Sequence, residues 1–472
     1  MNIKAIAGNV GYAFGAQGIS MMLSVVISLV VPKFIGIESY GYLQLFLFYS
    51  SYSVFFHLGL NDGLYLRFGG CKFEDFINDK TAGQFYLSAI YLSIIGFAIA
   101  GIGFLTTDDP DRLFVIVAFS IYLVLYDLNN MLGAIFQASN RIGNYAFSVT
   151  VEKIIAAACI AAVLFFGDRA VAPLIIAFVL GKMVSLAYCV WVARKLFAAK
   201  SASLRTACYE ALANIKVGVK LTIANSAGLM VTGIARIVID GFAGVELFGQ
   251  VSLALSLTNF FLAFISQVGM VLFPSLRREE KSVLLKFYRK TRIGIAAFFP
   301  IILLCYAPVV AILQLWLPEY EMAFICLGIV MPVCYFDGKT NMLLNTYLKV
   351  YRREAVLLVV NIAAVLLSGI STLVAVYVLH SLYAVFVFIL ASVVLRSVAL
   401  ELLVSKMLSI RMTHQVVIEI LLAALFVIAN TLCSTIVAFQ VLCVLSIGYY
   451  LLDKNNYRSL FKSFFRGVKS SS

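Results

Sequence analysis

Apolar runs of about twenty residues follow one another along this chain, and an α-helix needs that length to cross a lipid bilayer. Of the 472 residues, 62% are hydrophobic and only 12% are charged, and the mean hydropathy is +1.00. A soluble globular domain carries about 25% charged residues. Because no polar stretch is long enough to form a soluble catalytic domain, we expect an all-α integral membrane protein.

The apolar runs predict fourteen membrane-spanning helices. Helices are the expected form, because backbone polar groups in lipid must pair within their own segment. A membrane β-barrel would instead show alternating segments of about ten residues. The last apolar stretch, residues 416–452, holds two spans if a turn lies near Asn430–Thr435. The predicted spans are residues 11–31, 41–62, 83–105, 113–136, 147–166, 171–193, 217–240, 247–273, 292–316, 322–346, 355–378, 381–403, 414–433 and 435–452.

The distribution of Lys and Arg predicts the orientation of the spans, because cytoplasmic loops accumulate these residues. If the N-terminus is cytoplasmic, most of the 36 Lys and Arg lie in or beside cytoplasmic segments, chiefly residues 194–220 and 274–292. The basic tail after residue 453 is then cytoplasmic as well, which requires an even number of spans. The net charge of +13 is therefore mainly a topology signal. It also suits contact with anionic membrane lipids, and it does not indicate nucleic-acid binding.

Two short segments that lie 208 positions apart indicate an internal duplication. Residues 34–41 read FIGIESYG and residues 242–249 read FAGVELFG, with Phe, Gly, Glu and the closing Gly in common. A second match aligns YDLNNML at 126–132 with FDGKTNML at 336–343, if one inserted residue is allowed. The expected parts are an N-lobe with spans 1–6 (residues 1–200), a C-lobe with spans 7–12 (201–408), and an extra helix pair with the basic tail (409–472).

Each lobe holds an even number of spans, so both lobes have the same orientation in the membrane. This arrangement implies a pseudo-twofold axis along the membrane normal. A doubled bundle of this kind is a common plan for transporters, in which the substrate path runs between the halves. The sequence therefore favours a transporter over a channel or a scaffold.

Four basic residues lie within predicted spans, where a charge is costly and usually faces a cavity or a partner. They are Lys182, Arg236, Lys339 and Arg396, and Lys182 lies near the middle of its span. One interpretation is a cationic cavity that binds an anionic cargo, such as a diphosphate or an acidic sugar. The other interpretation is that these side chains snorkel to the interface or form ion pairs within the protein.

Four titratable residues are candidates for ion coupling. Asp127 and Asp337 occupy equivalent positions in the two lobes, and His57 and Asp62 lie at the inner end of the second span. A buried carboxylate can carry a coupling H+ or Na+, and a His side chain titrates near neutral pH. The alternative is a set of interhelical hydrogen-bond clusters without a role in transport.

The sequence contains little that suits catalysis or metal binding. The nine cysteines are scattered without CxxC spacing, so we expect neither a disulfide framework nor a metal site. The absence of a G-x-x-x-x-G-K-[ST] phosphate loop argues against a nucleotide-driven pump. We therefore expect no catalytic residues, no cofactor beyond a coupling H+ or Na+, and a protein that is not an enzyme.

Three stretches of the chain resemble the polysaccharide transporter family. They are PKFIGIESYGYLQLF (residues 32–46), HLGLNDGLYLRFGG (57–70) and ARIVIDGFAGVELFGQVSLALSL (235–257). This family comprises the Wzx-type O-antigen and oligosaccharide-lipid flippases of the multidrug/oligosaccharidyl-lipid/polysaccharide exporter superfamily. The resemblance implies two six-helix lobes around a central cavity that opens alternately to the two faces of the membrane.

The resemblance also implies a cargo and a location. The cargo would be an oligosaccharide repeat unit on undecaprenyl diphosphate, carried from the cytoplasmic to the periplasmic leaflet of a bacterial inner membrane. The transported repeat units would be used to make O-antigen, capsule or exopolysaccharide. A polysaccharide polymerase or glycosyltransferases would be suitable partners. Many members lack the last helix pair, which in other members of the superfamily forms a groove for a lipid tail.

Two other functions remain open. A drug or cation antiporter of the same superfamily would favour buried acidic residues for a cationic cargo, whereas these spans hold basic as well as acidic groups. A membrane-embedded polysaccharide polymerase or glycosyltransferase would need a sizeable outside loop for its reaction centre, and every predicted outside loop is short.

Overall fold

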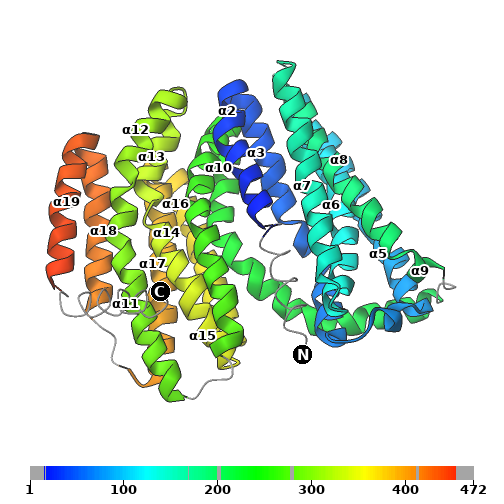
Figure 1. Ribbon diagram of the computed structural model, residues 1–472. Coiled ribbons are helices and arrows are strands. Elements are labelled where there is room, and N and C mark those ends of the chain that lie inside the picture. The colour runs from blue at the N-terminus through cyan, green and yellow to red at the C-terminus, as the bar shows by residue number, and fades with distance from the viewer. Residues whose placement is uncertain are drawn as a thin grey trace, which may run out of the picture. The chain divides into compact units, whose positions relative to one another are not determined.

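Helices and the turns between them make up the described part of the chain (Figure 1). The computed structural model describes residue 15 and residues 17–167, 170–198, 203–276, 281–410 and 414–452. The chain divides into unit 1 (Met1–Ser226) and unit 2 (Ala227–Ser472), and the division falls inside one long helix, α10. The start of the first predicted span and the basic tail lie outside the described residues.

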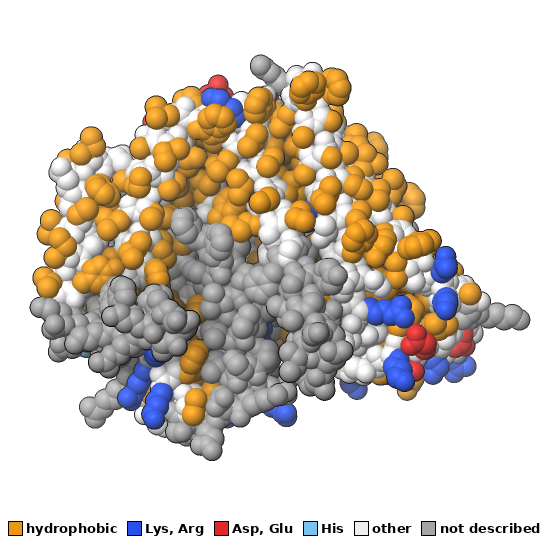
Figure 2. All heavy atoms as spheres, in the orientation of Figure 1, with side chains coloured by type: hydrophobic (Ala, Val, Ile, Leu, Met, Phe, Trp, Pro, Cys, Tyr) orange, Lys and Arg blue, Asp and Glu red, His pale blue; other side chains and the backbone are white. Residues whose placement is uncertain are grey.

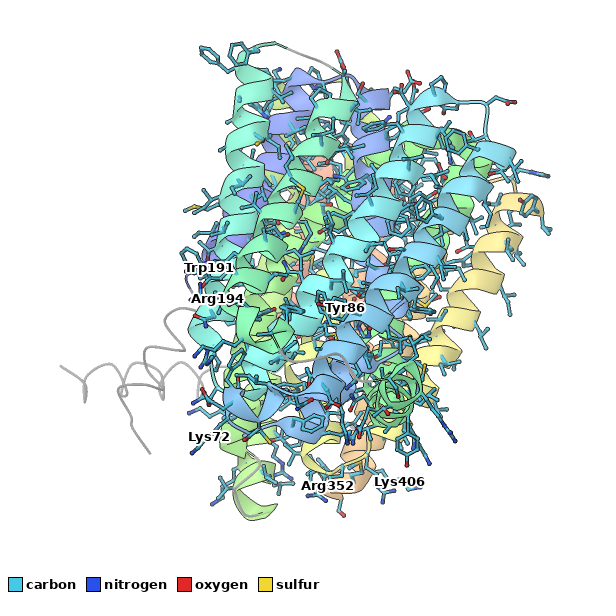
Figure 3. All side chains as sticks on the ribbon, turned by 90° about the vertical axis from the view of Figure 1, so that its right-hand side faces the viewer. Lys72, Tyr86, Trp191, Arg194, Arg352 and Lys406 are labelled. Atoms are coloured by element: carbon cyan, nitrogen blue, oxygen red, sulfur yellow. The ribbon has the colours of Figure 1, made fainter. Side chains whose placement is uncertain are left out.

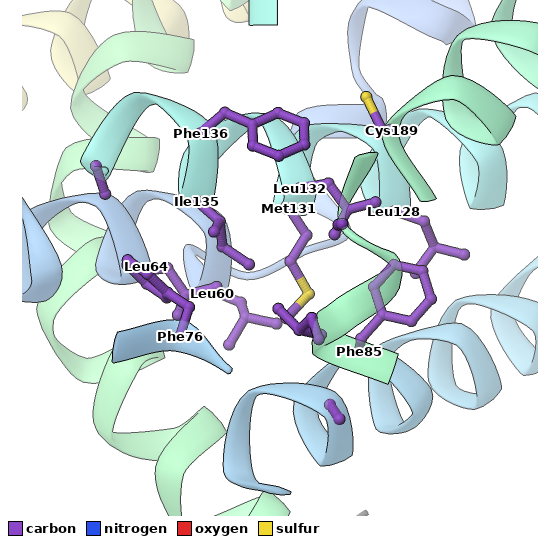
Figure 4. Close-up of a cluster of buried hydrophobic side chains, with 14 of the residues drawn as sticks. Leu60, Leu64, Phe76, Phe85, Leu128, Met131, Leu132, Ile135, Phe136 and Cys189 are labelled. Atoms are coloured by element: carbon purple, nitrogen blue, oxygen red, sulfur yellow. The ribbon is translucent and has the colours of Figure 1, made fainter. Parts of the chain in front are cut away.

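Helix α6 forms the centre of unit 1, where it packs against α3, α4, α5 and α8. In its most apolar stretch 50% of the residues are buried, against 17% in α5. Leu60, Met131 and Phe136 belong to a buried apolar cluster between these helices (Figure 4). The first described helical stretch of unit 1 is Gln17–Phe34, which contains a π-helical turn (Val26–Val30) and ends with α2 (Val31–Phe34). The other described helices of this unit are α3 (Ile37–Ser51), α4 (Leu60–Phe68), α5 (Asp79–Thr106), α6 (Pro110–Ala138), α7 (Ile142–Phe165), α8 (Val171–Val192), α9 (Arg194–Phe197) and the first part of α10 (Leu204–Leu276).

The start of α6 is fixed by its local sequence. The Asp109 side chain accepts hydrogen bonds from the backbone N–H groups of Asp111 and Arg112, and Pro110 occupies the first turn. The hydroxyl of Tyr42 on α3 also donates to the Asp109 carboxylate. Burial raises the pKa of Asp109, but these donors outweigh it and leave the pKa below its usual value. The cap therefore stays ionised and ties α3 to the start of α6.

The second predicted span, residues 41–62, was expected to be continuous, and the structure shows that it is broken. The stretch Ile37–Phe55, which ends in a 3₁₀ turn, meets α4 at an angle of 49°. Leu58 and Gly59 have φ angles of 53° and 91° at the break, a left-handed conformation that glycine adopts without strain. The apolar pattern continues through this turn, so hydropathy alone could not reveal it.

Helix α4 crosses α10 with the two backbones in direct contact. A Cβ atom added at Gly63 would lie 2.0 Å from the carbonyl oxygen of Asn214, and one at Gly218 would lie 2.0 Å from the carbonyl oxygen of Gly59. The Asn214 side chain also donates to Gln84 on α5 at 2.7 Å. The first part of α10 is therefore a fixed component of unit 1.

Helix α17 has the central position in unit 2, where it packs against α13, α14 and α16. A π-helical turn at Thr340–Leu344 continues α14 into α15, and α13 meets this segment at an angle of 46°. The remaining helices of unit 2 are α11 (Lys281–Leu304), α12 (Tyr306–Trp316), α13 (Glu321–Val330), α14 (Val333–Lys339), α15 (Asn345–Val350), α16 (Glu354–Tyr377), α17 (Leu382–Leu408), α18 (Gln415–Leu432) and α19 (Thr435–Leu452).

These helices confirm the all-α membrane class. Among the described residues, 11 helices are long and apolar enough to cross a membrane, or 13 if each of the two bent pairs is one span. The seventh and eighth predicted spans run together as α10, which is interrupted at Gly244 by non-helical angles (φ 81°, ψ 177°). The turn predicted near Asn430–Thr435 is confirmed, because α18 ends at Leu432 and α19 begins at Thr435.

The extra helix pair is docked firmly on unit 2. Helix α18 packs against α13, and α19 packs against α11 and α12. The hydroxyl groups of Tyr449 and Tyr450 on α19 donate to the carbonyl oxygens of Ala296 and Ala297 on α11, at 3.2 and 2.7 Å. The pair is therefore a packed part of this unit.

The surface has the character expected of a protein in lipid. Apolar side chains cover much of the face shown in Figure 2. Phe97 on α5, for example, is 80% exposed. Basic side chains gather at helix ends, with Lys72 and Arg194 near one end of unit 1, and Arg352 and Lys406 near one end of unit 2 (Figure 3). Exposed apolar area on this scale is typical of a surface that does not face water.

Gly63→Ala should destabilise unit 1, because the new methyl group would collide with the backbone of α10. Overpacking of this kind costs about 1–3 kcal/mol, so the thermal unfolding midpoint of the purified protein in nanodiscs should fall. Gly101→Ala is the matched control, since a Cβ at this position in α5 meets no atom within 4 Å. Equal midpoints for the two variants would contradict the close crossing.

Candidate functional site

Lys182 on α8 is buried in unit 1 and bound to an acidic residue of α7. Its Nζ lies 2.5 Å from Oε2 of Glu152, and the other oxygen of Glu152 lies 2.9 Å from Nζ of Lys153. The side chains of Lys182 and Glu152 are 8% and 7% exposed, whereas Lys153 is 26% exposed. An ammonium in such a place needs an anionic partner, because the desolvation of a bare charge is costly. Glu152 supplies that partner and shares it with a second, more accessible cation.

Two tyrosine rings of α6 complete the surroundings of Lys182. The ammonium lies 4.9 Å from the ring centre of Tyr126 and 5.6 Å from that of Tyr122. Aromatic faces attract cations at this range. A hydrogen-bonded chain lies one turn further along α8, where Asn129 of α6 donates to Ser185 at 2.6 Å and Ser185 donates to the Ser148 carbonyl at 2.9 Å. The relative positions of α6, α7 and α8 are thus fixed by polar contacts at Lys182 and one turn beyond it.

Asp127, next to Tyr126 on α6, is a buried carboxylate that accepts no hydrogen bond from the described part of the chain. It is 2% exposed, and neither of its side-chain oxygens has a partner among the described residues. Lys182 is near enough to attract it electrostatically, but the ammonium makes its hydrogen bond to Glu152. Unsatisfied buried carboxylates are rare and costly, so Asp127 remains a candidate for binding a coupling ion.

The other two candidates for ion coupling in unit 1 lie on either side of the break in the second span and have different hydrogen-bond partners. His57 is buried at the break in the second span, where its Nδ1 accepts the backbone N–H of Gly59 at 3.0 Å. Asp62 accepts a hydrogen bond from the hydroxyl of Thr222 on α10. His57 lines the same cavity as Asp127, whereas Asp62 is not among the residues that line it.

Unit 2 contains a larger network of buried charges, which we call the unit 2 network. It consists of Arg292 (α11), Lys339 (α14), Glu401 (α17) and Glu419 (α18), with side chains that are at most 5% exposed. Lys339 Nζ lies 2.7 Å from Glu401 and 3.0 Å from Glu419, and Arg292 Nε lies 2.9 Å from Glu401. Arg292 also pairs with Glu419. Two cations face two carboxylates, so the network is neutral and joins four helices.

The other predicted residues of unit 2 form two smaller contacts. Arg396 of α17 pairs with Asp337 of α14, and its guanidinium also donates to the Gly228 carbonyl of α10 at 3.4 Å. Arg236 donates to the hydroxyl of Ser252 at 2.6 Å and lies over the ring of Phe248. Asp337 and Lys339 thus point to different partners, as expected for residues two positions apart on a helix.

The predicted cationic residues therefore have different surroundings. Lys182 lies in unit 1 beside Asp127, whereas Lys339, Arg396 and Arg236 lie in unit 2 in separate contacts. Lys339 has no exposed surface and is occupied by two carboxylates. Lys182 has one carboxylate partner, Glu152, which also contacts Lys153. Lys182 is therefore better placed than Lys339 to exchange its partner for another anion.

Sequence reasoning missed the acidic partners and the aromatic neighbours of the buried cations, namely Glu152, Glu419, Tyr122 and Tyr126, together with Arg292. One signal for Glu152 was present. It and Lys182 each lie fifteen residues from Gly167, in the turn between α7 and α8, so an antiparallel helix pair places them opposite each other. No comparable signal marks Glu419, because α18 is far along the chain from α11 and α14.

The profile of the polysaccharide biosynthesis protein family matches residues 6–279 of the sequence. The fold is similar to lipid II flippase MurJ in an inward closed conformation, with a TM-score of 0.65, 11% identity, and 98% of this chain and 99% of that chain covered. It is also similar to an inward-facing MATE family multidrug resistance transporter of the MOP superfamily, with a TM-score of 0.62, 14% identity, and 82% and 94% covered.

A MOP superfamily transporter from Pyrococcus furiosus is a third similar structure, with a TM-score of 0.51, 13% identity, and 85% of this chain and 95% of that chain covered. No curated protein matches the sequence. At these low identities, the structural comparisons establish a common fold and nothing further.

Glu419→Gln should strongly destabilise unit 2, because it leaves two buried cations with one carboxylate. Breaking a buried pair in this way costs about 3–5 kcal/mol. The double variant Lys339→Met/Glu419→Gln keeps the network neutral and should lose less than the sum of the two single changes. Thermal unfolding of the purified variants measures both effects, with the exposed Glu321→Gln as control. Additive losses, or a Glu419→Gln variant as stable as the wild type, would contradict this account.

Proposed function

The chain belongs to the polysaccharide biosynthesis protein family, and on this basis we propose that it is a flippase for a lipid-linked oligosaccharide. The cargo is a sugar repeat unit on undecaprenyl diphosphate, which crosses from the cytoplasmic to the periplasmic leaflet of a bacterial inner membrane by alternating access. The product serves O-antigen, capsule or exopolysaccharide synthesis, and both chain termini are cytoplasmic. The fold shared with a lipid II flippase supports transport of a lipid-linked molecule.

The observation that carries this proposal is the buried Lys182 with its exchangeable partner. A diphosphate that enters a low-dielectric interior needs a cation, and an ammonium offers a strong charge-assisted hydrogen bond. Exposing an unpaired Lys182 to receive it would be costly. Because Glu152 also contacts Lys153, it can release Lys182 to a phosphate and keep a cationic partner of its own. One anion then replaces another, and the charge on Lys182 stays compensated throughout.

Asp127 is the proposed site of ion coupling. Asp337, its counterpart in the predicted repeat, is paired with Arg396, whereas Asp127 has no hydrogen-bond donor among the described residues. A carboxylate that the protein leaves unsatisfied can bind and release H+ or Na+ as its surroundings change during the transport cycle. His57 lies in the same cavity and is a second candidate for the proton.

Lys182→Ala should reduce transport of a fluorescent lipid-linked oligosaccharide in proteoliposomes by about tenfold or more, the equivalent of one charge-assisted hydrogen bond of about 1.5–3 kcal/mol. Lys33→Ala is the control, since Lys33 is an exposed cation at the end of α2. The variants are compared at equal abundance in the membrane, and Lys182→Arg should retain part of the activity. Unchanged transport by Lys182→Ala would refute the proposed role of this residue.

Asp127→Asn should remove the dependence of transport on pH or on sodium, because an amide cannot exchange a proton or supply a carboxylate charge. The measurement is the initial rate in vesicles with an imposed pH or sodium gradient. Asp79→Asn, a change at an exposed position at the start of α5, should respond to the gradient like the wild type. If Asp127→Asn keeps the same dependence as the wild type, coupling does not pass through this residue.

A further inference from the structure

The first part of α10, residues 204–223, runs across the lower ends of the unit 1 helices (Figure 1), and we call it the crossing segment. It precedes Ser226–Phe260, the part of α10 that is long and apolar enough to span a membrane. Glu210 pairs with Arg67 at the end of α4 and with Lys80 at the start of α5, at 3.4 and 3.2 Å. These contacts place the crossing segment at the ends of two spans, where the hydrocarbon of a bilayer meets the headgroups.

The helical repeat of 3.6 residues gives the crossing segment three faces. One face is buried in unit 1, the second is exposed and apolar, and the third is exposed and basic. They consist, in this order, of Ala207, Ala211, Asn214 and Gly218; Leu204, Cys208 and Leu212; and Arg205, Lys216 and Lys220. A helix with this pattern lies at a membrane interface, with its apolar face toward the acyl chains and its basic face among the headgroups.

The three basic side chains of the crossing segment have no carboxylate partner among the described residues. Arg67 and Lys80 close by are, in contrast, both paired with Glu210. Lys216 and Lys220 lie one turn apart on the same face, so that one anionic group can reach both ammonium groups. Cations at a membrane surface attract anionic lipid headgroups, and a lipid phosphodiester would supply the negative charge that the described protein does not.

A cavity of about 240 Å³ adjoins the apolar face of the crossing segment and lies between it, α4, α5 and α6. Leu58, Tyr91, Cys208 and Leu212 line the cavity and are also exposed, so the cavity opens to the surface between α5 and the crossing segment. Lys216 follows Leu212 by one helical turn. The mouth of the cavity and the basic face are therefore neighbours.

The wall of this cavity is apolar even where polar residues contribute to it. Nδ1 of His57 accepts the backbone N–H of Gly59, and the Asn61 side chain donates to the backbone carbonyl of Asp127. Both carboxylate oxygens of Asp127 are buried beneath the wall. The volume is smaller than the roughly 300–1,000 Å³ of sites that enclose a drug-sized ligand. The cavity therefore suits a hydrocarbon chain that belongs to a larger molecule outside it.

We propose that the crossing segment and this cavity form a binding site for an anionic glycerophospholipid of the surrounding membrane. One acyl chain enters between Tyr91 and Leu212, and the phosphodiester headgroup lies on Lys216 and Lys220. The second acyl chain stays in the bilayer. A zwitterionic lipid with the same chains has no net charge and binds more weakly. The site takes a lipid of the membrane, so the proposal does not rest on the identity of the transported cargo.

The test titrates dioleoylphosphatidylglycerol into the purified full-length protein in micelles of a neutral detergent. The readout is the rate of maleimide alkylation at Cys208, resolved by peptide mass spectrometry, with the exposed Cys433 as internal control. Phosphatidylglycerol should slow alkylation of Cys208 severalfold in a saturable manner and leave Cys433 unaffected. Dioleoylphosphatidylcholine should need at least a tenfold higher mole fraction, because each of two lysines strengthens binding of an anionic lipid about fivefold.

One pair of variants tests the headgroup contact. Lys216→Gln/Lys220→Gln should lower the affinity for phosphatidylglycerol to that for phosphatidylcholine. Lys72→Gln/Lys195→Gln removes two exposed cations of unit 1 that lie outside α10, and it should bind both lipids like the wild type. The control changes the net charge by the same amount, so it separates a local contact from general attraction to a basic protein.

A second pair of variants tests the chain contact. Leu212→Trp should weaken protection by both lipids, because the indole fills the mouth of the cavity. Tyr209→Trp changes an exposed position of the same helix that does not line the cavity, and it should have no such effect. Protection is the ratio of the Cys208 rates without and with lipid. Cys189, which is buried in unit 1, should stay unreactive in every variant, which shows that the unit is folded.

Several outcomes would overturn the proposal. They are equal protection by the two phospholipids, protection at both Cys208 and Cys433, and unchanged binding of phosphatidylglycerol by Lys216→Gln/Lys220→Gln. Undecaprenyl phosphate is titrated in parallel and should need a higher mole fraction, because its methyl-branched chain is thicker than an acyl chain. Protection at a lower mole fraction would instead assign the cavity to the lipid of the cargo. Because the assay has no transport step, a negative result would leave the proposed flippase function untouched.

Discussion

A charge inside a membrane protein has to be neutralised by a group that lies within hydrogen-bond distance, and this constraint organises both units. In unit 2 the two cations and two carboxylates of the unit 2 network are fully enclosed and balanced. In unit 1 the balance is looser, because Glu152 divides its two oxygens between Lys182 and a partly exposed Lys153. The first arrangement suits a rigid core, and the second suits a site that exchanges its partners.

The same constraint gives the extra helix pair a physical role. Glu419 on α18 provides one of the two carboxylates that neutralise Lys339 and Arg292. Without this helix pair, the interior of unit 2 would retain two cations and one carboxylate. The hydrogen bonds from Tyr449 and Tyr450 of α19 to α11 would also be lost. The pair therefore stabilises unit 2, whatever further part it has in handling lipid.

The sequence predicts features that depend on local composition and misses those that depend on contacts between distant segments. The all-α class and the turn before Thr435 follow from runs of apolar residues, so they could be predicted. The break at Gly59 could not be predicted. It accompanies the close crossing with Gly218 on α10, a contact between distant segments that does not affect the hydropathy pattern. Lys182 stood out as a charge in an apolar span, but its ion pair became visible only when α7 and α8 were placed side by side.

The central claim is that the ion pair between Lys182 and Glu152 serves transport as well as stability, and a charge swap separates the two roles. The double variant Glu152→Lys/Lys182→Glu restores an opposite-charge pair but moves the cation from α8 to α7, so that a carboxylate replaces the ammonium that lies 4.9 Å from the ring centre of Tyr126. The direct measurement compares its unfolding midpoint and its transport of a lipid-linked oligosaccharide with those of the two single variants. We expect the swap to recover most of the lost stability and little of the transport. Transport at the wild-type rate would show that the pair is structural only and would contradict the account.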